Sequence, residues 1–176
     1  MLDEHHAVRI EIGVIADTHG LLRPEAARAL AGVARIIHAG DVGEPGILDR
    51  LRRIAPVVAV RGNVDHGPWA NALPETEVVD VGGALIYVLH DLEMLDLDPA
   101  AAGFGVVISG HSHRPLIETR GGVLFLNPGS AGPRRFDLPI TLARLTLDGG
   151  APVARLVALG GGGGMMKGNT TCASDS

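Results

Sequence analysis

Apolar residues in the first third of this chain alternate between short buried runs and helical spacings. The runs predict strands over residues 8–16, 34–39 and 57–60. Between the strands, proline opens a predicted helix over 24–31, and apolar residues recur at helical spacing over 46–54. A strand–helix–strand–helix–strand order is typical of a mostly parallel sheet with crossover helices.

After residue 76 the pattern changes to strands separated by glycine-rich turns, such as the hairpin signal Gly82-Gly83. These strands are predicted over residues 77–81, 84–89, 106–109, 116–119, 123–126, 139–147 and 153–159. A βαβ half followed by a strand-rich half predicts an α/β fold in which two sheets pack together with helices outside. We expect one domain over residues 1–159. Residues 160–176 begin with five consecutive glycines and are expected to form a flexible tail.

Composition excludes some classes of function. The chain has 176 residues, of which 15 are basic and 20 acidic, giving a formal net charge of −5. Because no overall positive field attracts a polyanion, a long nucleic acid is a poor candidate partner. The apolar runs are too short to span a bilayer, so we expect no membrane segment. Cys172 is the only cysteine and no signal peptide is evident, which favours the cytoplasm.

Candidate metal ligands recur where the predicted strands end. They are Asp17, His19, Asp41, Asn63, His90, His111 and His113. The carboxyl ends of strands line the ligand crevice in open α/β sheets, so five strand ends could converge on one place. Carboxylate, imidazole and amide groups without a thiolate suit manganese, iron, nickel or zinc, and they argue against a structural zinc site.

The spacing within these motifs bears on how cations would be shared. In Asp17-x-His19, alternate residues near a strand end can both reach one cation, and His111-x-His113 would place both imidazoles on one side if that segment is extended. Asp41 follows a glycine, as expected of a carboxylate that bridges two ions from a tight turn. Each motif alone is also typical of an ordinary turn or loop. Their common position at strand ends predicts a metal site.

The sequence resembles the calcineurin-like metallophosphoesterase superfamily, and within it the small bacterial and archaeal phosphodiesterases. The motifs that carry this resemblance lie at residues 16–20, 37–41, 60–65, 110–115 and 127–130, and it covers roughly residues 8–159. It implies a four-layer α/β/β/α sandwich of two mixed sheets. It also implies two divalent metal ions, with manganese favoured and nickel, iron or zinc also suitable.

The resemblance further implies a role for each candidate ligand. Asp17, His19 and His113 would hold one ion, whereas Asn63, His90 and His111 would hold the other. Asp41 would bridge the two ions.

The implied function is hydrolysis of small phosphodiesters by attack of a metal-bridging hydroxide. Asp41, Asn63 and His90 would then act through the bound hydroxide and by positioning the phosphate. A homodimer is expected by analogy with small relatives. An alternative is a catalytically inactive interaction module, similar to the retromer scaffolding subunit that shares this fold. A dinucleotide-binding domain is disfavoured, because no G-x-G-x-x-G follows the first strand.

Other polar residues adjoin these motifs. His38 and Asp65 are candidates for orienting the ligands, and Arg61 and Arg114 for contacting phosphate, although all four also fit ordinary structural or surface roles. Residues 127–130 are interpreted as a turn that supports the site. Arg134 and Arg135 are interpreted as solvated charge.

Two positions depart from the family pattern. Val64 stands where larger family members have a histidine that is a candidate proton donor, so the general acid is unassigned. His90 is followed by Asp91 rather than by the glycine and histidine of the small relatives. The Asp91 carboxylate could repel a phosphate or serve as a partner to a ligand.

Overall fold

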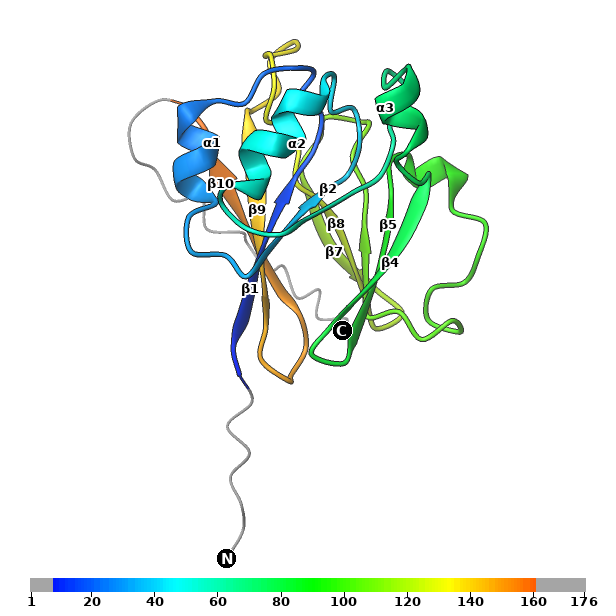
Figure 1. Ribbon diagram of the computed structural model, residues 1–176. Helices are drawn as coiled ribbons and strands as arrows, with labels where there is room; N and C mark the ends of the chain where they lie inside the picture. The colour runs from blue at the N-terminus through cyan, green and yellow to red at the C-terminus, as the bar shows by residue number, and fades with distance from the viewer. Residues whose placement is uncertain (1–7, 161–176) are drawn as a thin grey trace, which may run out of the picture.

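The computed structural model describes residues 8–160 and contains two β-sheets with short helices (Figure 1). Its elements are β1 (Ile10–Ile15), α1 (Pro24–Ala29), β2 (Arg35–His38), α2 (Pro45–Arg52), β3 (Val57–Ala59), α3 (Pro68–Asn71), β4 (Thr76–Val81), β5 (Ala84–Leu89), the 3-10 helix η1 (Leu92–Met94), β6 (Val106–Ile108), β7 (Leu116–Arg120), β8 (Val123–Asn127), β9 (Thr141–Leu147) and β10 (Val153–Ala158).

Both sheets are mixed and five-stranded. The first has the order β10-β9-β1-β2-β3, in which β1, β2 and β3 are parallel and β9 and β10 pair antiparallel. The second has the order β4-β5-β6-β8-β7, in which β5, β6 and β8 are parallel. The predicted α/β sandwich of two mixed sheets is therefore confirmed.

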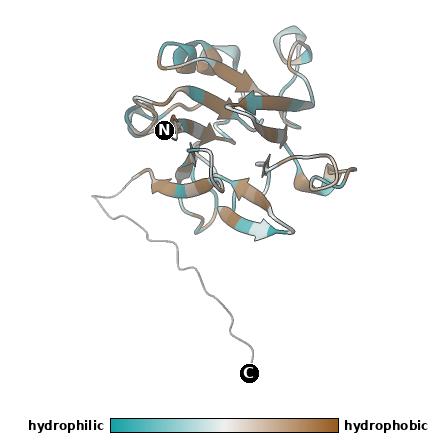
Figure 2. Ribbon diagram, turned by 90° about the horizontal axis from the view of Figure 1, so that it is seen from below, coloured by the Kyte–Doolittle hydropathy of each residue, from teal (hydrophilic) through white to brown (hydrophobic). Residues whose placement is uncertain are grey.

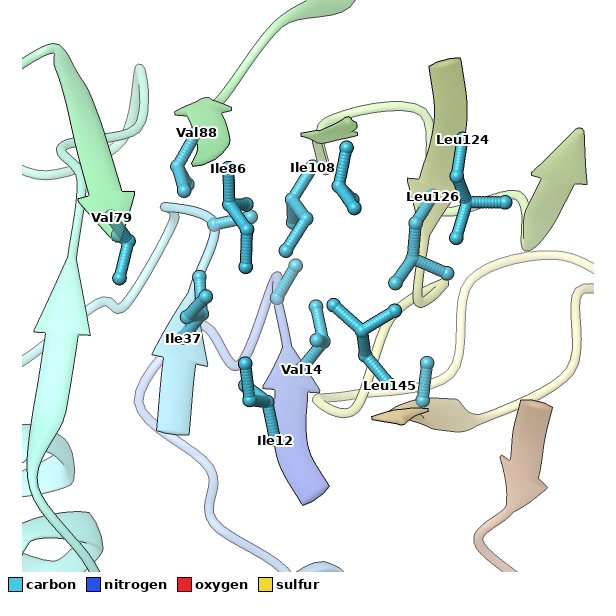
Figure 3. Packing of buried hydrophobic residues seen from close by; sticks show 14 of the residues in the cluster. Ile12, Val14, Ile37, Val79, Ile86, Val88, Ile108, Leu124, Leu126 and Leu145 are labelled. Atoms are coloured by element: carbon cyan, nitrogen blue, oxygen red, sulfur yellow. The ribbon is translucent and has the colours of Figure 1, made fainter. Parts of the chain in front are cut away.

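The period of two along each strand divides the apolar residues between two layers. In β1, Ile12 and Val14 belong to the cluster between the sheets, whereas Ile15 belongs to the cluster beneath the helices. Figure 3 shows side chains of the second sheet, among them Ile86 and Ile108, pointing toward those of β1 and β2. The main core thus lies between the two sheets.

The outer faces of the two sheets are covered differently. Helices α1 and α2 pack on the first sheet, and Leu30 and Leu51 are fully buried there. On the second sheet, η1 and the irregular residues around it supply the cover, with Leu92 and Phe104 packed against the buried cluster that contains Tyr87. This outer layer is a 3-10 turn and loop rather than α-helices. Figure 2 shows hydrophobic residues along the strands of both sheets.

The sequence pattern located the strands and the two longer helices but missed α3 and η1. Both are about one turn long, too short to display a helical period. Among the described residues, no helix is long and apolar enough to cross a membrane. The single domain over residues 1–159 stays a prediction, as does the tail over 160–176, of which all but Gly160 lies outside the described residues.

The two sheets present the carboxyl ends of their parallel strands to the same place. The backbone N–H of Gly110, after β6, donates to the carbonyl of His90, after β5, at 2.9 Å. The His90 imidazole in turn donates to the carbonyl of Ala39, after β2, at 2.7 Å. These bonds join loops of the second sheet to a loop of the first and bring the candidate ligands together.

Candidate metal centre

The loops after β1 and β2 continue the hydrogen-bonded pairing of those strands beyond their ends. The backbone N–H of Asp17 donates to Gly40 at 3.0 Å, and that of His19 donates to Asp41 at 3.0 Å. Along this ladder the backbone is left-handed at Asp17, His19 and Asp41, with φ of 54°, 46° and 55°. L-residues rarely adopt such angles, so the surrounding bonds must hold them there.

A first cluster of metal-binding side chains contains Asp17, His19 and His113. The Nε2 atoms of the two histidines are 3.2 Å apart. Asp17 Oδ1 lies 3.4 Å from His113 Nε2 and 4.0 Å from His19 Nε2. One potential ligand atom from each residue therefore faces a common point.

A second cluster contains Asn63, His90 and His111. Asn63 Oδ1 lies 3.0 Å from His90 Nε2 and 3.0 Å from His111 Nδ1, and these two nitrogens are 3.3 Å apart. Because His90 Nδ1–H donates to the Ala39 carbonyl, Nε2 is the ring nitrogen that faces the cluster.

Asp41 lies between the two clusters. Its Oδ2 atom is 3.3 Å from His90 Nε2 and 3.9 Å from His19 Nε2. Its Oδ1 atom accepts the backbone N–H of Val64 at 3.0 Å. Asp17 also approaches both groups, since its carboxylate lies within ligand range of Asp41 and His90. Two carboxylates are thus available to both clusters.

Burial and hydrogen bonds shift the pKa values at this centre in different directions. Burial alone would favour a neutral Asp41, but the hydrogen bonds from His90 and Val64 outweigh it and lower the pKa of Asp41. Burial likewise opposes charge on His90, yet its bonds to Asp41 and Ala39 raise the pKa of His90. Burial lowers the pKa of His19, which keeps that imidazole neutral and able to bind a cation.

Unpartnered polar atoms show that the residues present fit a cation. Both carboxylate oxygens of Asp17 are buried without a hydrogen-bond partner, as is Nδ1 of His113. A buried carboxylate without a partner is costly, and a divalent cation would compensate it. The donor set of carboxylates, imidazoles and an amide suits borderline divalent metals.

His38 is buried next to the ligand loops and is neutral. Burial lowers the pKa of His38 to about 4. Its Nδ1 accepts the Gly40 N–H at 3.2 Å. The Thr18 hydroxyl donates to the Val42 carbonyl, so His38 Nε2–H donates to Thr18 Oγ1 at 2.9 Å. His38 therefore links the Asp17–His19 loop to the Asp41 loop.

Asp65 holds two ligand loops together. Its carboxylate accepts the backbone N–H groups of Val42 at 3.2 Å, Gly43 at 2.9 Å and Gly62 at 2.8 Å. The first two follow Asp41 and the third precedes Asn63. Both residues expected to orient ligands thus lie behind the clusters, bonded to the backbone of the loops.

Residues 127–130 form the expected supporting turn. Asn127 Nδ2 donates to the Gly110 carbonyl at 2.7 Å, and Ser130 Oγ donates to the Asp17 carbonyl at 3.0 Å. The turn therefore fixes the segments that carry His111 and Asp17.

The remaining predicted site residues lie at the rim. Arg61 pairs with Glu75 at 2.5 Å and lines a hollow beside the second cluster. Arg114 is exposed and lines a neighbouring hollow. The Asp91 carboxylate lies 3.8 Å from His111 Nε2, on the side of the ring opposite Asn63. Its position fits a partner that orients His111.

The condition under which His111 and His113 would lie on one side is not met. The segment from His111 to His113 is not extended, because both residues are left-handed, with φ of 66° and 59°. Their imidazoles consequently point to different clusters. The sharp turn after Gly110 causes this, and the side-chain period of a strand does not apply to it.

Arg135 is exposed, as expected of a solvated charge. Its positive charge is among the influences that lower the pKa of His19, after the dominant effect of burial. Nothing in the sequence pattern placed residue 135 near residue 19, because only the fold brings the loop after β8 beside the loop after β1.

The chain belongs to the calcineurin-like phosphoesterase superfamily, whose domain model matches residues 10–150. A probable metallophosphoesterase from Methanocaldococcus jannaschii is 40% identical over 132 residues, covering 68% of this chain and 67% of the relative. Another from Methanothermobacter thermautotrophicus is 34% identical over 166 residues, covering 82% and 95%. The phosphodiesterase YfcE of Escherichia coli is 27% identical over 164 residues, covering 76% and 85%. The resemblance to the small phosphodiesterase subgroup is thereby confirmed.

Solved structures share the fold. Vacuolar protein sorting 29 from Cryptosporidium parvum superposes with a TM-score of 0.74 at 22% identity, covering 86% of this chain and 92% of that one. A protein described as a novel archaeal phosphodiesterase superposes with a TM-score of 0.72 at 23% identity, covering 85% and 100%. At these identities the superpositions establish the fold alone.

Removing the Asp65 carboxylate is expected to loosen the centre. In Asp65→Ala, three backbone N–H groups lose their acceptor, which should cost about 1–3 kcal/mol of unfolding free energy. Metal affinity should fall roughly 10–100-fold, as for other partners that support ligands. Urea unfolding of metal-free protein and metal titration measure the two effects.

Asp49→Ala, on the exposed side of α2, is the control and should change neither the unfolding free energy nor the metal affinity. Wild-type metal affinity in Asp65→Ala would contradict the supporting role.

Proposed function

We propose that this chain is a dinuclear metal-dependent phosphodiesterase that hydrolyses small phosphodiesters. The observation that carries the proposal is the position of Asp41, whose carboxylate lies between a cluster of Asp17, His19 and His113 and a second cluster containing His90. Membership in a phosphoesterase superfamily and the names of the relatives support the same reaction class.

The ligand assignment follows the two clusters. Asp17, His19 and His113 would hold one ion and the second cluster would hold the other, with the Asp41 carboxylate available to both. When bound, the ions would lower the pKa of a water molecule and neutralise the phosphoryl oxygens during in-line attack. The donors present suit manganese, and also nickel, iron or zinc.

The protein's own groups position the reactants. The Asn63 amide and the His90 imidazole lie side by side at the second cluster, next to the hollow that Tyr87 and Met94 also line. A phosphate at the metals can therefore extend an ester group into this hollow. Phosphoryl transfer depends mainly on positioning and charge stabilisation, so few further protein groups are needed.

A non-catalytic interaction module is the alternative. Solved structures of vacuolar protein sorting 29 share this fold, so the fold alone does not decide between the two functions. The unpartnered oxygens of buried Asp17 favour the metal-dependent reading. A cytoplasmic location and a homodimer stay predictions of the sequence.

Loss of the shared carboxylate distinguishes these functions. Asp41→Asn should lower the bound metal per chain and reduce kcat on bis(p-nitrophenyl) phosphate by roughly 10²–10³-fold, because the main charge between the clusters is removed. Elemental analysis and steady-state kinetics measure the two effects. Asp80→Asn, near the end of β4 and bonded to the β4–β5 turn, is the matched control. A metal-free, inactive wild type, or an Asp41→Asn protein with full metal and normal turnover, would count against the proposal.

Leaving-group chemistry should limit the rate, because Val64 offers no proton. Val64 is 38% exposed at the site, and only its backbone N–H is used. For a series of aryl methyl phosphates, kcat/KM should fall steeply as the pKa of the leaving phenol rises. Val64→His should raise the rate on the poorest leaving group by about 10²-fold while changing the best one little, since general acids contribute about 10²–10⁴-fold. Equal wild-type rates across the series would show that another donor acts.

Metal binding should release protons in acid. The pKa of His90 is raised, so its proton is retained to a higher pH than in a free histidine, and a cation at Nε2 must displace it. Apparent Mn²⁺ affinity should therefore fall as pH drops below the His90 pKa, with more protons released near pH ~6 than near pH ~8. Calorimetry in buffers of different ionisation enthalpy counts these protons. His90→Gln should remove the difference, and proton release that is equal at both pH values would contradict it.

A further inference from the structure

The hollow beside the second cluster extends from the candidate metal centre onto the outer face of the second sheet. Asn63, His90 and His111 line it together with Tyr87 and Leu89 of β5, which belong to the cluster on that outer face. The hollow has a volume of about 690 Å³, within the range of small-molecule sites. It therefore has room for an organic group attached to a phosphate at the metals.

The Tyr87 hydroxyl is a polar group of this hollow that lacks a partner. Tyr87 is only 8% exposed, and its ring packs against that of Phe104 with the centroids 5.1 Å apart. Within residues 8–160 the hydroxyl forms no hydrogen bond, yet it is not sealed from solvent. Because a buried tyrosine normally finds a partner for its hydroxyl, this one is available to a ligand that enters the hollow.

The charges around the hollow are mostly negative. Its carboxylates belong to Asp65, Glu75, Asp91 and Asp96, and its guanidinium belongs to Arg61. Asp65 is occupied by backbone N–H groups, and Glu75 pairs with Arg61 at 2.5 Å. Asp91 uses Oδ1 to cap η1, and Asp96 is exposed and in no ion pair within residues 8–160. Asp91 and Asp96 thus leave negative charge in the hollow uncompensated.

These carboxylates are not arranged to hold a further metal ion. Within the described part of the chain, only the candidate metal centre brings three acidic or histidine ligand atoms within 4.8 Å of one another. Carboxylates spread around a hollow suit a larger organic cation, which can bond to one or two of them. An ammonium group can also donate to the Tyr87 hydroxyl, whereas a second phosphate would be repelled.

The distance along β5 sets the length of such a ligand. Tyr87 precedes His90 by three residues of extended chain, which is about 10 Å along the backbone. The Tyr87 side chain spans part of this distance. A short aminoalkyl chain on a phosphate at the metals can span the remainder.

We infer that the hollow selects phosphodiesters in which one ester group is a short aminoalkyl chain. The phosphate binds at the metals, and the ammonium bonds to the Tyr87 hydroxyl and to the Asp96 carboxylate, with Asp91 adding negative charge. This inference rests on the proposed phosphodiesterase function and deepens it by naming the substrate class. Tyr87 and Asp96 are binding residues that determine which ester is accepted.

Binding of two phosphinates to Mn²⁺-loaded protein tests this selectivity without turnover, because their P–C bonds are not hydrolysed. Each has one negative charge on phosphorus, as a phosphodiester has. (3-Aminopropyl)(methyl)phosphinate carries an ammonium group, and butyl(methyl)phosphinate has a methyl group in its place. The wild type should bind the aminopropyl compound about 10-fold or more tightly than the butyl compound, the usual effect of hydrogen bonds to a charged group.

Variants locate the selectivity in the hollow. Tyr87→Phe keeps the ring that packs on Phe104 and removes only the hydroxyl, so it should weaken the aminopropyl compound by about 3–10-fold. Asp96→Asn should weaken it by roughly 3–5-fold, as for an exposed ion pair. Both variants should bind the butyl compound as the wild type does. Glu93→Gln makes the same change of charge in the same segment but lines the neighbouring hollow, so it is the matched control and should change neither affinity.

Kinetics and metal content separate this role from a structural one. All three variants should hold as much metal as the wild type. Tyr87→Phe and Asp96→Asn should lower kcat/KM for p-nitrophenyl 3-aminopropyl phosphate and leave that for p-nitrophenyl butyl phosphate unchanged.

The outcomes distinguish this inference from the proposed function. Equal affinity of the wild type for the two phosphinates, or equal effects of Asp96→Asn and Glu93→Gln, would overturn the selectivity. A preference that persists in Tyr87→Phe would overturn the contact with its hydroxyl. A wild type without metal or turnover overturns the proposed function, and the selectivity with it. Normal metal content and turnover without a preference for the ammonium overturn the selectivity alone.

Discussion

The hydrogen bonds that carry the β1–β2 pairing into the next loops hold Asp17, His19 and Asp41 in left-handed backbone conformations. Such conformations cost of order 1–3 kcal/mol each and persist only where the surroundings enforce them. Here His38, bonded to Thr18 and Gly40, and Asp65, bonded to both ligand loops, supply that enforcement. The side chains of the centre are thus aimed by a strained backbone that the rest of the fold stabilises.

The charges of this strained centre make it suited to cations. Asp17 and Asp41 are buried within a chain of net charge −5, and both oxygens of Asp17 have no partner. The positive charge of a protonated His90, which the Asp41 carboxylate favours, compensates one carboxylate at most. Two divalent cations against two carboxylates would leave the centre positive, which reverses the local field and makes it attractive to a phosphate. The two buried carboxylates are therefore costly without cations but are suited to binding metal and anion together.

The sequence predicted the features that depend on the pattern of neighbouring residues along the chain. Periodic apolar runs located the strands, and the position of polar residues at strand ends predicted which side chains converge. Strand periodicity does not describe tight turns or distant partners. It would place His111 and His113 on one side only if the segment were extended, but the left-handed turn after Gly110 sends them to different clusters, as the resemblance implied. The contact between Asp91 and His111 and the hydrogen bond from Ser130 to the Asp17 carbonyl arise only when separate loops meet in the fold.

The uneven charge around the centre also bears on the size of the substrate. A polynucleotide bound across the two metals would place further phosphates on both sides of the scissile one. On the side of the second cluster these would lie among Glu75, Asp91 and Asp96, where the one arginine is already paired. Repulsion there disfavours every additional phosphate, whereas a short ester with an uncharged group in the hollow avoids it. The local field, and not only the overall negative charge, therefore favours small diesters under the proposed function.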